Sequence, residues 1–461
     1  MRRVFIANRG EIALRIVRAC RRLGLECVVG CSEVDREGLA ARSADRAVCI
    51  GPGPAGQSYL RDDLIVQAAL GTGCDAIHPG YGFLAESPRL AARAREHGLR
   101  FVGPPPEVME LAGDKLAARE QARLAGVPVL PGREVGSAKE ARALAEEIGY
   151  PVLIKAAGGG GGRGIKLARD GSELDARLGI ARHEAGAAFG DERVYIERFI
   201  AAARHVEVQI AADDRGEVVH LFERDCSAQR RYQKLVEEAP APGLGASSRT
   251  SLLEAAVRFA RAISYRNLGT FEFVVDAASG EFFFLEINCR IQVEHPVTEE
   301  VTGRDLVALQ LRLANGEPLG FSQEEVTLAG HAVECRLCAE DPARGFLPSP
   351  GKLEAFSVPS LPGLRVDTHC HPGAVVPPFY DSLLAKLIAH AQRREEAIEL
   401  LLEALGQLEV TGVATNRALL ADVLASEEFR RAEITTDWLE RALAAGAIGP
   451  RAVGATGGAG G

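Results

Sequence analysis

The segment that most constrains the fold of this chain spans residues 269–295 and reads GTFEFVVDAASGEFFFLEINCRIQVEH. Two apolar runs, TFEFVV and EFFFLEI, flank the turn-forming DAASG, and this pattern predicts a β-hairpin. In the second arm polar and apolar residues alternate, so an extended strand places the polar side chains on one face. The polar residues of that face are Glu286, Asn288, Arg290, Gln292 and Glu294.

The polar face of this hairpin has two interpretations. Antiparallel sheets commonly have one solvated face, so the alternation by itself is compatible with a surface strand. Glu272 in the first arm, however, can pair close to Glu286, and two close carboxylates repel unless a cation or a proton intervenes. A hard divalent cation with oxygen ligands from Glu272, Glu286 and Asn288 removes that repulsion. The arginine, amide and carboxylate that follow are typical of an anion site beside a metal site.

The N-terminal region predicts a doubly wound α/β domain. An apolar run at residues 3–8 precedes a helical pattern and a second apolar run, LECVVGCS, which together indicate a βαβ unit. Its first turn holds one glycine, so the GxGxxG fingerprint of dinucleotide-binding domains is missing. We therefore favour a plain α/β domain over NAD binding.

A glycine-rich loop marks a second unit within residues 130–203. Lys155 ends an apolar run and is followed by five glycines, residues 158–162, and a returning strand that carries Lys166. Glycines allow backbone N–H groups to approach phosphate oxygens. A flexible linker is the alternative, but linkers are rarely bracketed by two strands, and a Walker A loop would need GK[ST]. We predict a mobile lid that covers phosphates.

Composition limits the classes of partner and the compartment. A formal net charge of −9 argues against a general nucleic-acid partner, because phosphate neutralisation needs a basic surface. No apolar run reaches the length of a membrane span, and the first residues lack the apolar core of a signal peptide, so we expect a cytoplasmic protein without a membrane partner. The ten cysteines are scattered, and we expect reduced thiols. Cys335 and Cys338 form a CxxC, but a strand would point them to opposite faces, which disfavours zinc.

Taken together, the motifs resemble those of biotin carboxylases, enzymes of the ATP-grasp superfamily. The motifs stand in the family's order over residues 1–445: NRGEIALR, HPGYGFLAES, IKAAGGGGGRG, ERDCSAQRRYQK, EEAPAP, FLEINCRIQVEHPVTE, HAVECR, FLPSPG and YDSLLAKL. The resemblance implies a mixture of α/β and α+β folds in three domains. These are an N-terminal α/β domain (1–115), an ATP-grasp domain (116–330) with the lid (130–203), a C-terminal mixed α/β domain (331–446), and then a Gly- and Ala-rich tail (447–461) that we expect to be disordered.

The resemblance also implies a role for each motif residue. The implied ATP contacts are Lys115, Lys155 near the phosphates, Gly160, Gly161, Gly162, Glu197 near the adenine, Arg198, Ile200, His205, Gln229 and Tyr232. The implied ligands of two Mg²⁺ or Mn²⁺ ions are Glu272, Glu286 and Asn288. The implied bicarbonate site consists of Lys234, Arg290, Gln292, the backbone of Val293, and Glu294. Arg290, Glu294 and Arg336 are the implied catalytic residues, with Arg336 stabilising the biotin enolate.

The implied reaction is the ATP- and bicarbonate-dependent carboxylation of biotin through carboxyphosphate, the first half-reaction of acetyl-CoA carboxylase in fatty acid synthesis. The only methionines are Met1 and Met109, so the Met-Lys-Met segment that bears biotin is absent and we expect a separate biotin carboxyl carrier protein. The other implied partners are carboxyltransferase subunits and a second copy of the chain in a homodimer.

Three residues depart from the family pattern, and three other functions are alternatives to the implied one. Tyr232 stands where the family usually has histidine, and Cys289 and Cys338 replace threonine and asparagine. One alternative is the biotin carboxylase subunit of another acyl-CoA or pyruvate carboxylase. The second is a different ATP-grasp ligase that activates another carboxylate, and the third is a nucleotide-binding regulatory module without turnover.

Overall fold

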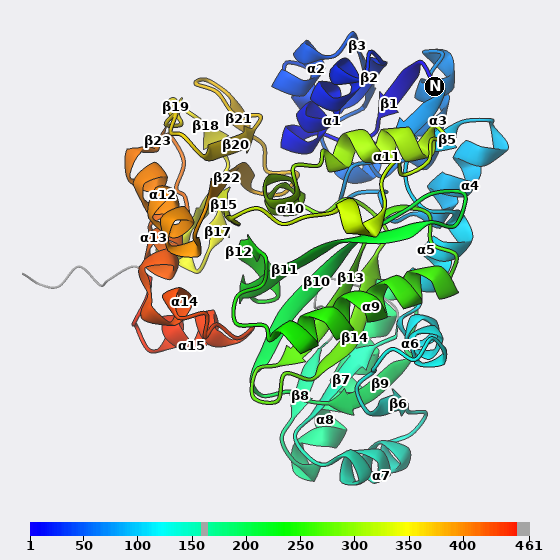
Figure 1. Ribbon diagram of the computed structural model, residues 1–461, viewed down its shortest axis with the longest axis vertical. Coiled ribbons are helices and arrows are strands. Elements are labelled where there is room, and N and C mark those ends of the chain that lie inside the picture. The colour runs from blue at the N-terminus through cyan, green and yellow to red at the C-terminus, as the bar shows by residue number, and fades with distance from the viewer. Residues whose placement is uncertain (158–164, 450–461) are drawn as a thin grey trace, which may run out of the picture.

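The computed structural model describes residues 1–157 and 165–449. It places an N-terminal parallel sheet, a small four-stranded sheet and a C-terminal helical layer around one central antiparallel sheet (Figure 1). The glycines predicted to cover phosphates, Gly160, Gly161 and Gly162, lie outside the described residues. So does most of the predicted disordered tail, residues 450–461.

The N-terminal unit is the doubly wound α/β domain that the sequence predicts. Its parallel strands are, in spatial order, β3 (Arg46–Gly51), β2 (Glu26–Ser32), β1 (Arg3–Ile6), β4 (Ala76–His78) and β5 (Arg100–Phe101). Its helices are α1 (Gly10–Arg22), α2 (Leu39–Ser43), α3 (Asp62–Gly71), α4 (Pro88–Glu96) and α5 (Pro106–Gly113). The strand order reverses between β1 and β4, and in such sheets ligands bind at the carboxyl ends of the strands beside the reversal. The segments that leave these two strands, residues 8–10 and 79–83, therefore mark a binding crevice.

The central sheet is antiparallel, and its two faces differ sharply in chemistry. Its strands are, in spatial order, β14 (Phe282–Asn288), β13 (Asn267–Asp276), β10 (Ala203–Ala212), β11 (Val218–Arg230), β12 (Gln233–Ala239), β15 (His331–Cys338), β22 (Leu383–Ala391) and β20 (Leu364–Thr368). On one face Phe271 and Phe273 of β13 pack in a core with Phe259 of helix α9 (Ala246–Ala262). Successive side chains of a strand point to opposite faces. The polar residues that alternate with the apolar ones, such as Glu272 on β13 and Glu207 on β10, therefore lie on the other face.

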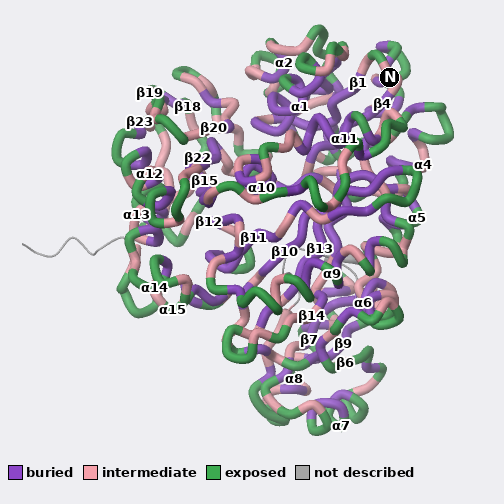
Figure 2. The backbone as a smooth tube through the Cα atoms, viewed as in Figure 1, coloured by how far each residue is buried: buried purple, intermediate pink, exposed green. Residues whose placement is uncertain are grey.

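The polar face of the central sheet is not a solvated surface. Figure 2 shows β10, β11 and β13 as mostly buried, and their charged side chains are buried with them. Glu207 and Arg224 are 0 % exposed and Glu272 is 3 % exposed. Charged groups at such depth must be paired or bind a ligand. The surface-strand interpretation of the hairpin is therefore excluded in favour of a site.

The four-stranded sheet forms a unit with its own core at the lower end of Figure 1. Its strands are, in spatial order, β6 (Gly132–Glu134), β9 (Val194–Arg198), β7 (Val152–Ala156) and β8 (Lys166–Ala168), with helices α7 (Ala138–Ile148) and α8 (Gly171–Phe189), and helix α6 (Lys115–Leu124) precedes them. Leu144, Ile154 and Ile196 belong to a hydrophobic cluster made within this unit. A lid over residues 130–203 needs a core of its own, and this unit has one. The mobility of the lid stays a prediction.

The C-terminal region shares the central sheet with the preceding region. β15 pairs with β12 on one side and with β22 on the other, so one sheet crosses the predicted boundary between residues 330 and 331. The helices after β14 are α10 (His295–Thr302), α11 (Leu306–Ala314), α12 (Arg394–Gln407), α13 (Arg417–Ala425), α14 (Glu427–Arg430) and α15 (Trp438–Ala444). The short strands are β16 (Glu340–Asp341), β17 (Leu347–Pro348), β18 (Gly351–Lys352), β19 (Ala355–Ser357), β21 (Val375–Val376) and β23 (Glu409–Thr411). Among the described helices, none combines the length and the apolarity needed to cross a bilayer.

Candidate active site

A pocket of about 910 Å³ joins the N-terminal sheet to the polar face of the central sheet. Residues 8–12 and 81–83 line it from the strand reversal, and Glu272 and Arg336 line it from the central sheet. Of the predicted nucleotide contacts, those that line the pocket are Lys115, Lys155, His205, Gln229 and Tyr232. Glu197, Arg198 and Ile200 lie on β9 and the turn after it. The pocket therefore collects side chains that are far apart in the sequence.

The predicted hairpin within residues 269–295 brings its two carboxylates together. Glu272 of β13 and Glu286 of β14 are direct partners in the strand register. Asn288, at the end of β14, donates from Nδ2 to Oε1 of Glu272 over 2.7 Å. These three residues, predicted as metal ligands, line the same pocket.

The prediction of an extended strand through Glu294 is wrong, because β14 ends at Asn288. The chain then turns and enters α10, whose first turn contains Pro296, a residue that fits the start of a helix and cannot donate in a ladder. The polar residues converge through hydrogen bonds instead. Arg290 donates from Nη1 to Oε1 of Gln292 (2.7 Å) and from Nη2 to Oδ1 of Asn288 (3.1 Å).

Lys234 of β12 joins three buried carboxylates. Its ammonium group lies 2.6 Å from Glu207, 2.9 Å from Glu272 and 2.7 Å from Glu294. Burial alone would lower the pKa of Lys234, but the three carboxylates raise it well above its ordinary value. At Glu207 burial opposes ionisation, but Lys234 and Arg224 together outweigh it, and the pKa falls to about 2. This part of the pocket is therefore a fixed array of full charges.

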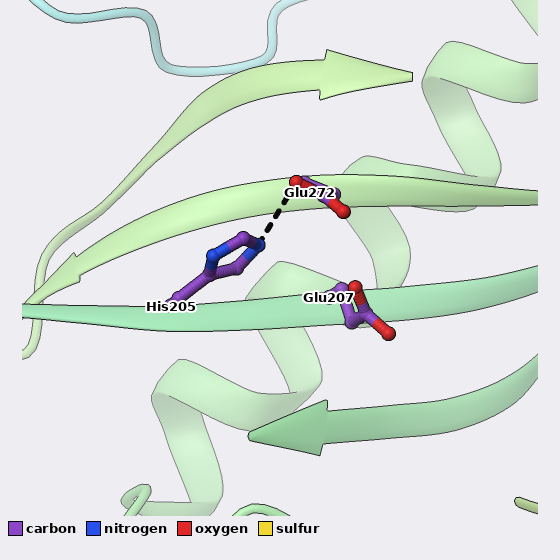
Figure 3. A group of neighbouring side chains, drawn as sticks. All are labelled: His205, Glu207 and Glu272. Carbon is purple, nitrogen blue, oxygen red and sulfur yellow. Dashed lines mark ion pairs between the residues drawn. The ribbon is translucent and has the colours of Figure 1, made fainter. Parts of the chain in front are cut away.

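His205 lies beside the same carboxylates, which favour its charged form. Figure 3 shows its ring, on β10, directed at Glu272 on the neighbouring strand, with Nε2 2.9 Å from the carboxylate. Burial lowers the pKa of His205, but the carboxylates of Glu272 and Glu207 raise it, and the net pKa lies above its usual value. One ligand atom from each of His205, Glu207 and Glu272 lies within 4.8 Å of the others. The ammonium of Lys234 contacts both glutamates of this group, and His205 faces Glu272, so the described residues form a network of ion pairs here.

The donor set predicted for divalent ions fits them. Glu286 lies 3.0 Å from the Lys115 ammonium, and Glu272 contacts Lys234, so each carboxylate has a lysine partner in this structure. Carboxylate oxygens and the amide oxygen of Asn288 are hard donors of the kind that Mg²⁺ and Mn²⁺ prefer. Glu286 is also partly exposed to the pocket, with 23 % of its side chain accessible.

Lys155 is anchored by a buried carboxylate. Its ammonium pairs with Glu197, which also accepts from Nη1 of Arg119 over 2.9 Å. Glu197 is 1 % exposed, so its carboxylate serves this ion pair rather than facing the open pocket. Its predicted place near an adenine stays a prediction. The arrangement leaves Lys155 at the pocket wall, where it can meet phosphate oxygens.

Arg336 of β15 reaches the base candidate Glu294. Its Nη2 lies 2.9 Å from Oε2 of Glu294 and 2.5 Å from Oε1 of Glu237 on β12. Burial opposes ionisation of Glu294, but Lys234 and then Arg336 lower its pKa below the ordinary value. Glu294 is therefore an ionised carboxylate at neutral pH, as a proton acceptor must be.

The peptide groups around Val293 are fixed by two buried side chains. Lys386 of β22, which is 0 % exposed, donates to the Val293 carbonyl over 2.9 Å. His295 donates from Nδ1 to the Gln292 carbonyl over 2.7 Å. Burial holds the pKa of His295 well below its usual value, so the ring stays neutral. The backbone predicted to meet bicarbonate is thus rigidly oriented.

The three departures from the family pattern fall in different surroundings. Tyr232 lies at the turn between β11 and β12 with 55 % of its area exposed, at the pocket wall. Cys338 also lines the pocket, and burial raises the pKa of its thiol to about 12. Cys289 is buried, belongs to the apolar cluster behind the sheet and also borders the pocket.

Sequence reasoning missed several charged residues of the site. Glu86 lies 3.3 Å from Arg290 and accepts from the backbone N–H of Cys289. Glu207, Arg224, Glu237 and Lys386 also belong to the buried charge array. The available signal was a charged residue inside an otherwise apolar run, as in RHVEVQI and LLAKLIAHA, since such residues are seldom buried without a partner.

Three family models match the chain along its length. These are the biotin carboxylase N-terminal domain over residues 1–109, the ATP-binding domain of the carbamoyl-phosphate synthase L chain over 114–322, and the biotin carboxylase C-terminal domain over 334–441. Among curated proteins, the biotin carboxylase of Pseudomonas aeruginosa is 49 % identical over 446 residues, which are 96 % of this chain and 99 % of that one. Biotin carboxylase 1 of Bacillus subtilis is 47 % identical and is covered to 98 %.

Solved structures with the same fold include complexes with nucleotide. A biotin carboxylase from Campylobacter jejuni in a β,γ-ATP complex has a TM-score of 0.93 at 42 % identity, over 95 % of this chain and 98 % of that one. The biotin carboxylase domain dimer of Hydrogenobacter thermophilus 2-oxoglutarate carboxylase, with MgADP, ADP and bicarbonate, has a TM-score of 0.93 at 44 % identity, over 96 % and 98 %. Rhizobium etli pyruvate carboxylase matches with a TM-score of 0.91 at 41 % identity, over 95 % of this chain but 40 % of that longer chain.

Proposed function

Because the chain belongs to the biotin carboxylase family, we propose that it carboxylates biotin on a carrier protein, using ATP and bicarbonate. The observation that carries this proposal is the Lys234 ammonium held by Glu207, Glu272 and Glu294 in a pocket that also contains Arg290 and Arg336. Fixed cations beside an ionised carboxylate suit the binding and deprotonation of a small oxyanion.

The nucleotide occupies the side of the pocket near the four-stranded sheet. Lys115 and Lys155 meet its phosphates, and Gln229 and Tyr232 line the wall beyond them. Glu272, Glu286 and Asn288 would hold the divalent ions, which when bound neutralise phosphate charge and align the transferred group. Lys115 would then exchange part of its contact with Glu286 for a phosphate oxygen.

Bicarbonate binds where Arg290 and Lys234 converge. Two cations grip its oxygens, and Glu294 takes its proton as it attacks the γ-phosphate, giving carboxyphosphate and ADP. Carboxyphosphate then releases CO₂ and phosphate, and the phosphate takes the proton from biotin N1′. Negative charge develops on the ureido oxygen, which Arg336 stabilises before the carbon of CO₂ bonds to the nitrogen.

The partners that we propose follow from the family. They are a separate biotin carrier protein and carboxyltransferase subunits, in line with relatives named biotin carboxylase at 47–49 % identity in Pseudomonas aeruginosa and Bacillus subtilis. Acetyl-CoA carboxylase is the preferred complex. A subunit of a pyruvate or 2-oxoglutarate carboxylase is the alternative, supported by solved structures of such enzymes at 41–46 % identity. We propose a homodimer, as in the Hydrogenobacter thermophilus structure.

The test is ADP release from ATP with Mg²⁺, with bicarbonate present or removed and with free biotin added or omitted. We expect ADP release to depend on bicarbonate and to rise with biotin. Glu294→Gln removes the proton acceptor and should lower this rate about 10²-fold or more. Glu281→Gln, in the exposed turn of the same hairpin, is the matched control and should leave the rate unchanged. Bicarbonate-independent ADP release would instead favour a ligase for another carboxylate.

A further inference from the structure

The guanidinium of Arg336 is held by two carboxylates rather than one. Nη2 contacts Glu294 at 2.9 Å and Glu237 at 2.5 Å, and both glutamates are 0 % exposed. Glu294 also contacts Lys234 over 2.7 Å, whereas Glu237 forms its one ion pair among the described residues with Arg336. The two carboxylates therefore meet the same cation from chemically different positions.

The contact with Glu294 weakens at the moment when Arg336 is needed. When Glu294 accepts the bicarbonate proton, it becomes neutral and its charge-assisted bond to Arg336 is lost. The enolate that Arg336 stabilises forms only after that step. A second anion that takes no substrate proton would keep the guanidinium in place between the two steps, and Glu237 is the carboxylate at that distance.

We propose that Glu237 is a positioning residue that holds Arg336 against the biotin side of the pocket while Glu294 is protonated. This inference rests on the proposed carboxylation of biotin. Glu237 exchanges no proton with substrate in this scheme, and it acts only through Arg336. Its carboxylate oxygens have no hydrogen-bond partner with standard geometry among the described residues, so the ion pair with Arg336 is its principal compensation for burial.

The charges around Glu237 come from four segments. β15 supplies Arg336 and, directly opposite Glu237 in the strand register, Glu334. Glu294 faces it from the turn before α10, and Lys234 lies on its own strand, while Lys386 of β22 acts on Glu334. Burial raises the pKa of Glu237 to about 7, with Arg336 opposing this rise. Burial also raises the pKa of Glu334, well above its usual range.

This pair of glutamates offers a matched test. Glu237→Gln removes the carboxylate that contacts Arg336. Glu334→Gln makes the same change directly opposite on β15, at a residue that forms no ion pair with Arg336 among the described residues. The readouts are carboxybiotin formation from free biotin and bicarbonate-dependent ADP release without biotin. We expect Glu237→Gln to lower the ratio of the first rate to the second by roughly 10- to 100-fold, because a misplaced group costs about that much. Glu334→Gln should leave the ratio within about twofold.

A double-mutant cycle separates positioning from a general structural defect. If Glu237 acts through Arg336, then Glu237→Gln in an Arg336→Met background should change carboxylation by less than about twofold. Losses that multiply in the double variant would overturn the proposal. So would a Glu237→Gln variant with an unchanged ratio while the wild-type protein carboxylates biotin. A wild-type protein without biotin-stimulated ADP release would refute the proposed function itself.

The wild-type pH profile provides a readout that does not depend on how the variants fold. The ratio of carboxybiotin formation to bicarbonate-dependent ADP release should fall as the pH is lowered from 8 through about 7, because Glu237 loses its charge there. In Glu237→Gln this change in the ratio should disappear. A wild-type ratio that is flat between pH 6 and 8 would contradict the proposal.

Discussion

Replacing Lys234 with methionine tests the buried charge array directly. The substitution keeps most of the side-chain volume and removes the ammonium that contacts Glu207, Glu272 and Glu294. Breaking a buried ion pair by removing one partner costs about 3–5 kcal/mol. Each carboxylate keeps one other cationic partner: Arg224 for Glu207, His205 for Glu272 and Arg336 for Glu294. We therefore expect a loss of about 3 kcal/mol in the free energy of unfolding, at the lower end of that range.

The pH dependence of this loss has a definite sign. In the wild-type protein the pKa of each of Glu207, Glu272 and Glu294 is lowered, so their contribution is present above the unfolded pKa of about 4.3 and is lost only as the pH falls below it. Without Lys234 we expect the folded pKa values to rise above the unfolded value, because burial is the largest effect on each carboxylate and Lys234 is the largest effect that opposes it. The folded variant then binds more protons than the unfolded chain, so its stability should decrease between pH 5 and 8. The slope is about 1.4 kcal/mol per pH unit for each proton taken up.

Urea unfolding at pH 5.5 and 8 measures both effects. Trp438, the only tryptophan, lies in the hydrophobic core that includes Val236 of β12, so its fluorescence reports on this region. Lys139→Met, which removes an exposed lysine of α7, is the control and should change stability by less than about 0.5 kcal/mol. A Lys234→Met variant as stable as this control, or one that gains stability as the pH rises, would refute the assignment of Lys234 as the neutralising cation.

Three further substitutions address separate parts of the pocket. Glu286→Gln removes a predicted metal ligand and should raise the Mg²⁺ concentration for half-maximal ADP release by about tenfold or more, with the KM for biotin unchanged as the internal control. Tyr232→His should make the KM for ATP depend on pH between 6 and 8, since the wild-type phenol, whose pKa burial raises further, does not titrate there. Lys386→Met frees the Val293 carbonyl and should raise the KM for bicarbonate more than the KM for ATP in steady-state kinetics; equal changes would count against a local role.

The sequence predicted the grouping of polar side chains better than the path of the chain between them. Alternation from Glu286 to Glu294 placed five polar side chains on one face. Four of them line one pocket although the strand ends at Asn288, and Glu294 contacts Lys234 of the same pocket. Pro296 was the visible signal that the strand does not continue past Glu294, because a proline there favours the start of a helix. The grouping survived because short hydrogen bonds among the side chains replace the strand geometry.

Contacts between strands that are far apart in the sequence could not be predicted from local sequence patterns. Glu237 and Arg336 meet because β12 and β15 are neighbours in the sheet, and no local period encodes that pairing. The same applies to Lys386, whose contact with Val293 depends on the place of β22. The N-terminal wall of the pocket, in contrast, follows from one rule, the reversal of strand order beside β1, once the strand order is known.

The ladder between β12 and β15 determines how the protein can be dissected. A fragment that ends at residue 330 would contain β12 with its N–H and C=O groups bare along one side, and an uncovered strand edge recruits other chains. The same cut would remove Arg336, the ion-pair partner of Glu237. Expression of such a fragment should give aggregates, whereas excision of the four-stranded unit, which carries its own core, offers a piece suited to separate study.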